Sequence, residues 1–210
     1  DGPVIVGARD PSAVTSRYGE RVTAVPLDLA RLASVRTFCE SAATHGPIGV
    51  MALNAGINPS RIAMTEDGFE RAFQVNYLAH ALIYQTLRAE LSDDALVMTT
   101  GSGTHDPEEK TPPPPPRHAN IAMLADPSTD PNRDRMAMRA GMRAYTSSKL
   151  CCIMMALELA RQEPGLTLAS FDPGFVPDTR LPRDIPGPIA AVVKRIIPFP
   201  MANDRTSSSA

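Results

Sequence analysis

The sequence predicts an α/β fold in which helices cover both faces of a parallel sheet. Short apolar runs alternate with helical patterns, the alternation extends through nearly the whole chain, and 43% of the 210 residues are hydrophobic. Strands that alternate with helices are typical of parallel sheets, because each helix returns the chain to the same edge of the sheet. A chain of this length and composition can bury one sizeable core, so we expect a single domain over residues 1–210.

The predicted elements follow one another in regular order. Short apolar runs bounded by turn residues predict strands, and apolar residues at helical spacing predict helices. The predicted strands are Val4 to Ala8, Val22 to Leu27, Gly49 to Leu53, Ala95 to Thr100 and Leu166 to Phe171. The predicted helices are Ser12 to Tyr18, Ser34 to Thr44, Phe69 to Leu91 and Tyr145 to Gln162.

One long segment, Thr104 to Met142, interrupts this alternation. It contains five consecutive prolines, Pro112 to Pro116, and shows no clear period. Connections of this length are usually lids, binding loops or disordered segments. Because the segment leaves the carboxyl end of a strand, where open α/β sheets bind ligands, we expect a lid-like insertion. Disorder of the proline run is the alternative.

Composition excludes several classes of partner. A net charge of −2 provides no concentrated basic face for nucleic acid or an anionic membrane. The longest apolar run, Leu150 to Leu157, is too short for a membrane span, and no apolar leader opens the sequence, so we expect a soluble protein. Cys39, Cys151 and Cys152 lack metal-ligand spacing, which indicates reduced thiols in a cytoplasmic protein and no metal site.

Tyr145 and Lys149 are four residues apart at the start of a predicted helix, so their side chains share one helical face. A phenol has an ordinary pKa of about 10, but a nearby ammonium favours the phenolate and lowers that pKa. The pair can therefore exchange a proton with a substrate oxygen. The same spacing is frequent by chance, and a solvated helix face is the alternative.

Three further motifs accompany this pair. They are Leu53-Asn54-Ala55-Gly56 after one strand, Phe73-Gln74-Val75-Asn76 in the long helix, and Leu96-Val97-Met98-Thr99-Thr100-Gly101-Ser102 at the end of another strand. In this order the motifs resemble the short-chain dehydrogenase/reductase family, from about Val4 to Thr179. The resemblance implies a Rossmann-type doubly wound parallel sheet and an oxidoreductase that uses a nicotinamide cofactor.

The resemblance also implies catalytic roles. Tyr145 matches the acid-base catalyst, and Lys149 matches the residue that lowers its pKa and holds the nicotinamide ribose. Ser102 matches the hydroxyl that binds the substrate carbonyl, and Asn76 matches the asparagine that anchors a water in the proton relay. These roles suit hydride transfer, which builds negative charge on a carbonyl oxygen. In isolation, Asn76 could instead simply line its helix, and Ser102 could cap a turn.

Arg9 decides the expected cofactor. It follows the first visible strand, where the family places the residue that reads the 2′ position of the adenosine ribose. An arginine can pair with a 2′-phosphate, which favours NADP(H) over NAD(H). Asp10 comes next and could face the ribose instead, and a solvated turn charge is the alternative for Arg9.

The remaining cofactor contacts follow from the same resemblance. Asn54, Ala55 and Gly56 match the turn beside the adenosine ribose, and Asp28 and Leu29 match the pair that borders the adenine. Pro173, Gly174 and Phe175 match the turn that passes the nicotinamide. Thr179 comes one position later than the family's threonine, so its contact with the carboxamide is open.

The amino-terminal part of the family's pattern is absent from the sequence. Val4 to Ala8 corresponds to the second strand, so the first strand and the glycine-rich loop that holds the pyrophosphate are missing. Asp1 is not an initiator methionine, and Thr206 to Ala210 resembles the opening of a helix, so we expect a fragment cut at both ends. Because the missing strand is central in the family's sheet, we expect a gap between strands.

The resulting hypothesis is an NADP(H)-dependent oxidoreductase. Its substrate would be a small molecule with a bulky apolar body and a carbonyl or alcohol group. The insertion, with Pro115 to Asn120, and the run Ser148 to Cys151 resemble the branch of retinol dehydrogenases and light-dependent protochlorophyllide reductases, so protochlorophyllide reduction is a second hypothesis. A non-catalytic NADP-binding sensor or inactive remnant is a third. The sequence leaves a homo-oligomer open.

Overall fold

The fold is taken from a computed structural model that describes residues 2–174. Its five strands in that range are β1 (Val4–Ala8), β2 (Val22–Pro26), β3 (Ile48–Leu53), β4 (Leu91–Thr100) and β5 (Thr167–Phe171). Its α-helices there are α1 (Pro11–Tyr18), α2 (Leu32–Ala43), α3 (Arg71–Phe73), α4 (Ala79–Leu87), α5 (Ile121–Ala125) and α6 (Ala137–Gln162). The observed order of strands and helices agrees with the predicted alternation.

The strands form two parallel sheets. β1 pairs with β2 from Val4 opposite Val22 to Ala8 opposite Pro26, whereas β3, β4 and β5 form a second sheet in that order. Within residues 2–174, no strand is hydrogen-bonded between β1 and β3. The prediction of a Rossmann-type parallel sheet without its first strand is therefore confirmed.

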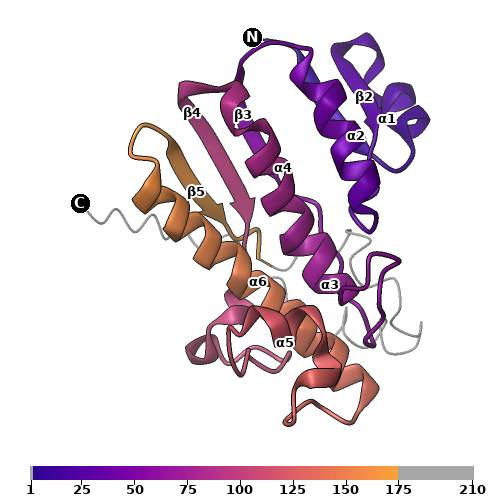
Figure 1. The fold of residues 1–210 in the computed structure, drawn as a ribbon, viewed down its shortest axis with the longest axis vertical. Helices are drawn as coiled ribbons and strands as arrows, with labels where there is room; N and C mark the ends of the chain where they lie inside the picture. The colour runs from indigo at the N-terminus through magenta and orange to yellow at the C-terminus, as the bar shows by residue number, and fades with distance from the viewer. Residues whose placement is uncertain (1, 175–210) are drawn as a thin grey trace.

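Helices α2, α4 and α6 lie across one side of the strands, and α1 packs against β1 and β2 (Figure 1). Apolar residues of α2 and α4 meet those of β3 and β4 in one core. Its most buried members include Val35, Cys39, Ile83, Tyr84 and Val97, each 5% exposed or less. This apolar layer fixes the three helices on the sheet and so determines where their polar residues lie. In the described part of the chain, no helix has both the length and the apolar content to cross a membrane.

The long helix predicted over Phe69 to Leu91 is shorter and interrupted. Glu70 caps its start, because Glu70 Oε2 accepts a hydrogen bond of 2.8 Å from the Phe73 backbone N–H. The residues Gln74–Leu78 form a π-helix, and α4 then continues to Leu87. A π-helical turn releases backbone carbonyls from the regular α-helical pattern, and such turns are common at functional sites.

Helix α6 begins at Ala137, two turns before the start predicted at Tyr145. Alanine, methionine and arginine favour helix, which supports the extra turns. Gly141 is required for packing rather than for flexibility. A Cβ there would lie 2.5 Å from both Pro59 O and Arg61 N, so the loop after β3 could not approach the helix.

The segment before α6 is fixed to that helix by hydrogen bonds and ion pairs. Thr146 Oγ1 donates to Pro114 O at 2.8 Å, and Arg143 donates to Pro115 O, so the proline run has defined partners. Asp134 pairs with Arg117 at 3.1 Å and with Arg143 at 2.6 Å. These contacts favour an ordered insertion over the disordered alternative.

Candidate active site

The predicted site residues follow the carboxyl ends of the strands. Arg9 and Asp28 come after β1 and β2, whereas Asn54, Ser102 and Pro173 come after β3, β4 and β5. Because paired strands run parallel, each sheet brings its own group of residues to one edge. This edge is where open α/β sheets bind ligands.

Asn76 is fully buried in the π-helix and joins two other elements. Its Oδ1 accepts from the Ile57 N–H at 2.8 Å, and its Nδ2 donates to Ile57 O at 3.0 Å. Nδ2 also donates to Ser148 Oγ at 2.8 Å, and that hydroxyl donates to Tyr145 O at 2.6 Å. The Asn76 side chain therefore ties the loop after β3 to the turn of α6 that carries Tyr145 and Ser148.

The backbone carbonyl of Asn76 has a partner that the sequence did not indicate. Cys152 Sγ donates to Asn76 O at 3.1 Å. Burial raises the pKa of the Cys152 thiol to about 11, so it stays protonated and can act as a donor at neutral pH. His80, which is 4% exposed, has its pKa lowered to about 4 by burial and by the Lys149 charge, so its ring is neutral.

Tyr145 and Ser102 lie together at the end of β4. Burial raises the pKa of Tyr145, while a hydrogen bond with the Ser102 hydroxyl acts in the opposite direction. Ser102 Oγ also accepts from the Thr104 hydroxyl at 3.0 Å and caps the short helical turn that follows. Ser102 thus both caps this turn and contacts Tyr145.

Lys149 is buried beside these residues, with 4% exposure. Its Nζ donates to Thr100 O at 2.8 Å and lies 5.9 Å from the centroid of the Tyr145 ring. Burial lowers the pKa of Lys149. Burial is the largest effect on the pKa of Tyr145 and raises it, so the expectation that Lys149 lowers that pKa stays a prediction.

Asp172 is a site residue that sequence reasoning missed. Its Oδ2 accepts from Gly103 N at 2.6 Å and its Oδ1 accepts from Gly174 N at 2.9 Å, so it joins the loops after β4 and β5. Its negative charge adds to the burial that raises the pKa of Tyr145 and opposes the burial that lowers the pKa of Lys149. Its position directly before the Pro-Gly turn was the available signal.

The turn after β3 approaches Lys149 closely. Thr100 Oγ1 donates to Asn54 Oδ1 at 2.8 Å, which joins the ends of β4 and β3, and Ala55 follows in the same turn. A Cβ on Gly56 would lie 3.2 Å from Asn76 Oδ1 and 3.6 Å from Lys149 Nζ. Glycine at this position therefore keeps the space beside the lysine ammonium open.

The residues predicted to bind the cofactor after β1 and β2 belong to the separate two-stranded sheet. Arg9 is exposed, and Asp10 caps α1 by accepting from Ser12 N at 3.1 Å and Ala13 N at 3.3 Å. Asp28 accepts from Ala30 N at 3.0 Å within its own turn. Leu29 is buried, and its carbonyl accepts from Gln74 Nε2 at 3.3 Å, which links this turn to the π-helix.

The turn after β5 is described in part. Pro173 and Gly174 follow Asp172, and Gly174 has a φ of 66°, in the left-handed region that glycine tolerates. The predicted contacts of Phe175 and Thr179 lie outside the described residues.

Comparison with curated proteins finds oxidoreductases. The chain is 34% identical to a candidate daunorubicin C-13 ketoreductase of Streptomyces sp. (strain C5), over 93% of this chain and 63% of that protein. It is 35% identical to the polyprenol dehydrogenase of Mus musculus, over 82% of this chain and 49% of that protein. It is 30% identical to the chloroplastic protochlorophyllide reductase of Daucus carota, over 79% of this chain and 46% of that protein. The chain thus spans about half to two thirds of the length of these relatives.

Solved structures with the same fold include a short-chain dehydrogenase/reductase of Burkholderia phymatum in complex with NAD. The match covers 92% of this chain and 60% of the Burkholderia phymatum chain, with a TM-score of 0.57 and 16% identity. A blue fluorescent protein from a metagenomic library, in complex with NADPH, covers 93% of this chain and 71% of its own, with a TM-score of 0.61 and 21% identity. No protein-family model matches the chain.

The parallel strands and the polar residues at their carboxyl ends define a Rossmann-type nucleotide-binding fold. With the curated relatives, they show that the chain belongs to the short-chain dehydrogenase/reductase family.

Proposed function

We propose that the protein is an NADP(H)-dependent oxidoreductase that interconverts a carbonyl and an alcohol on a bulky apolar substrate. The observation that carries the proposal is the contact of the Tyr145 phenol with the Ser102 hydroxyl, beside the buried Lys149 ammonium. A proton donor, a second hydroxyl and a cation in one place suit a reaction that develops charge on a carbonyl oxygen.

The chain's own residues perform the acid-base part of this reaction. Bound NADP(H) would supply or accept the hydride. Because burial raises the pKa of Tyr145, its phenol is protonated at neutral pH and is ready to donate to a substrate oxygen. Ser102 orients that oxygen through its hydroxyl. Once the proton has left, the Lys149 ammonium stabilises the phenolate, since opposite charges attract strongly in a buried site.

The residues present fit the ribose parts of a nicotinamide dinucleotide, while the glycine-rich loop for its pyrophosphate is not among them. Gly56 leaves space beside the Lys149 ammonium, where a Cβ would intrude, and Asn54 is held in place by Thr100. Asp10 is engaged as the cap of α1, which leaves Arg9 as the charged residue at the end of β1 that can meet a 2′-phosphate. This assignment supports NADP(H) as the cofactor.

The names of the relatives support an apolar substrate. The mouse relative is a polyprenol dehydrogenase, and the Streptomyces relative is a candidate ketoreductase of daunorubicin. Reduction of a panel of bulky apolar ketones and aldehydes, followed by the loss of NADPH absorbance and by detection of the alcohol, tests the proposal. We expect turnover with at least one such carbonyl. NADPH binding without reduction of any carbonyl would favour the sensor hypothesis.

Protochlorophyllide reduction is the second candidate, because the chain is 30% identical to the Daucus carota enzyme. The two candidates differ in their need for light. Protochlorophyllide is therefore incubated with the protein and NADPH in darkness and then illuminated. A light-dependent change in the pigment's absorbance would select this candidate, whereas carbonyl reduction in darkness selects the first.

A further inference from the structure

Asp172 lies where the loops after β4 and β5 meet. Its Oδ2 accepts from Gly103 N at 2.6 Å, and its Oδ1 accepts from Gly174 N at 2.9 Å. A Cβ on Gly103 would lie 3.2 Å from Asp172 Oδ2, so glycine at this position leaves room for the carboxylate to reach the backbone. Both carboxylate oxygens are engaged by backbone donors, which fixes the position of the negative charge.

The loop after β4 connects this charge to Tyr145. Gly103 directly follows Ser102, whose hydroxyl makes a hydrogen bond with Tyr145. The carboxylate is therefore held one residue away from the group that contacts the phenol. A negative charge at this place opposes the loss of the phenol's proton, because the phenolate would also be negative. Burial raises the pKa of Tyr145 most, and the charge of Asp172 raises it further.

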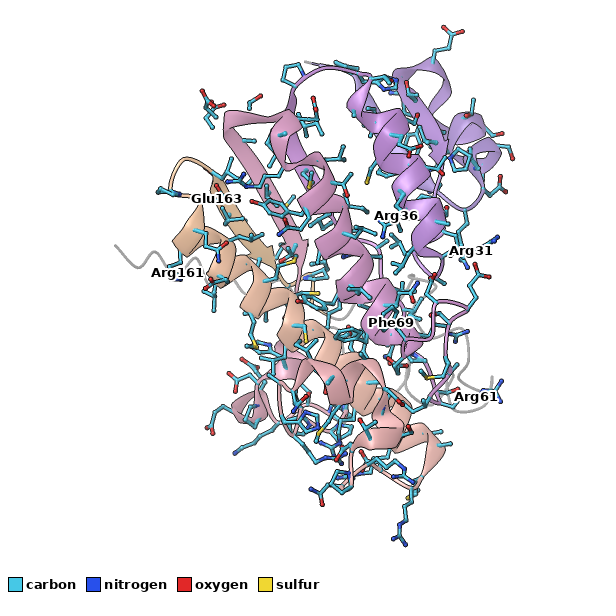
Figure 2. All side chains as sticks on the ribbon, in the orientation of Figure 1. Arg31, Arg36, Arg61, Phe69, Arg161 and Glu163 are labelled. Carbon is cyan, nitrogen blue, oxygen red and sulfur yellow. The ribbon has the colours of Figure 1, made fainter. Side chains whose placement is uncertain are left out.

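Helix α6 brings a cation to Tyr145. The Lys149 ammonium lies 5.9 Å from the centroid of the Tyr145 ring and favours the phenolate. Cys152 also lies near Tyr145, but burial raises its pKa to about 11, so this thiol is neutral at pH 7. Arg61 and Arg161 lie at opposite edges of the molecule, away from the end of β4 (Figure 2). The phenol is therefore subject to the lysine cation and to the carboxylate after β5.

The loop after β4 carries two more titratable side chains. His105 Nδ1 lies 2.6 Å from Ser102 O, so this ring contacts the backbone of the loop. A Cβ on Gly103 would lie 3.6 Å from Glu109 Cγ, so the Glu109 side chain passes close to the same backbone. Glu109 is therefore a second carboxylate beside this glycine. It packs against the loop, whereas Asp172 is hydrogen-bonded to it.

We propose that Asp172 is a positioning residue that keeps the Tyr145 phenol in its proton-donating form and thereby sets the alkaline limit of carbonyl reduction. Reduction requires the phenol to donate its proton to the substrate oxygen as the hydride arrives, and the phenolate cannot do so. The carboxylate extends the pH range in which the phenol keeps that proton. This role rests on the proposed oxidoreductase activity, but its effect on the phenol can be measured without turnover.

The ionisation of Tyr145 is measured by NMR on protein labelled with tyrosine that carries ¹³C at Cζ. The chain has four tyrosines, and Tyr145→Phe identifies the signal of Tyr145. We expect the pKa of Tyr145 to be lower in Asp172→Asn than in the parent, because the amide can still accept a hydrogen bond but carries no charge. Asp172 is exposed, so its substitution should leave the fold intact, and circular dichroism checks this.

Glu109→Gln is the matched control, because it removes a carboxylate beside the same glycine. It should leave the pKa of Tyr145 unchanged. An unchanged or higher pKa of Tyr145 in Asp172→Asn, or an equal decrease in both variants, would overturn the proposal. These outcomes hold whether or not a substrate is turned over.

Rates against pH test the consequence for the reaction. The value of kcat/KM for reduction of an apolar ketone should begin to fall at a lower pH in Asp172→Asn than in the parent, because the limit follows the ionisation of Tyr145. A loss of rate that is equal at every pH would indicate a merely structural role and would contradict the proposal. Failure of the parent to reduce any carbonyl would contradict the proposed function, whereas an active parent and an unmoved limit in Asp172→Asn would contradict the role of Asp172 alone.

Discussion

The predicted catalytic residues and the residue proposed to read the nucleotide lie in two regions that are held in different ways. Asn76 and Lys149 are almost fully buried, and their hydrogen bonds connect α6, the π-helix and the ends of β3 and β4. Arg9 is exposed, and the hydrogen bonds of its neighbour Asp10 stay within the first turn of α1. The predicted catalytic residues are thus held by a network of distant segments, whereas the proposed cofactor preference rests on one exposed charge.

The largest expected effect is on the catalytic region. Tyr145→Phe removes the proton-donating hydroxyl and keeps the ring, so turnover should fall at least about a hundredfold while NADPH affinity changes little. Steady-state rates and calorimetric titration of NADPH measure the two quantities. Tyr18→Phe, on α1 in the other region, is the control and should keep the parent's rate. A rate for Tyr145→Phe within a few-fold of the parent would end the assignment.

His80 links stability to pH in the same region. Its pKa is about 4 in the folded protein, against an ordinary value of 6.5, so the unfolded state takes up the proton first as the pH falls. The free energy of unfolding should therefore be highest above pH 6.5 and should decrease by about 3 kcal/mol as the pH approaches 4.

Denaturant unfolding across this pH range checks the His80 prediction. His80→Gln should flatten the decrease, whereas His45→Gln should leave it unchanged because His45 is exposed. The same slope in the parent and in His80→Gln would show that other groups cause the acid sensitivity.

Arg9 tests the nucleotide-reading region. Arg9→Ala should weaken NADPH binding by about tenfold to a hundredfold and NADH binding much less, because only NADPH carries the 2′-phosphate. Arg17→Ala removes a neighbouring charge on α1, which lies over Tyr18, and serves as the matched control. If both cofactors lose affinity equally in Arg9→Ala, then Arg9 does not read the phosphate.

The smallest expected effect separates a structural role for Asp10 from a cofactor role. Because Asp10 accepts from the first turn of α1, Asp10→Ala should lower Tm by a few degrees through the loss of the cap. The ratio of NADPH to NADH affinity should stay the same. A change in that ratio would mean that Asp10 faces the ribose.

The sequence predicted what depends on local patterns. The bounds of β1 agree with the prediction, and Tyr145 lies beside Ser102 at the end of β4, because short apolar runs and helical spacing are local signals. Asn76 contacts Ser148, one residue before Lys149. The catalytic roles of Tyr145, Ser102, Asn76 and Lys149 remain predictions.

The features that the sequence did not predict depend on contacts between distant segments. Cys152 reaches Asn76 O from another helix, and Asp172 connects two loops across the sheet edge. The early start of α6 rests on the close approach of the loop after β3 at Gly141.

The most direct test of the central claim is the transfer of deuterium from NADPH deuterated at the nicotinamide C4 to an apolar ketone, detected in the alcohol by mass spectrometry. The account predicts deuterium in the alcohol with the parent protein and a rate at least about a hundredfold lower with Tyr145→Phe. An alcohol that forms without deuterium from either face of the cofactor, or equal rates in parent and variant, would contradict it.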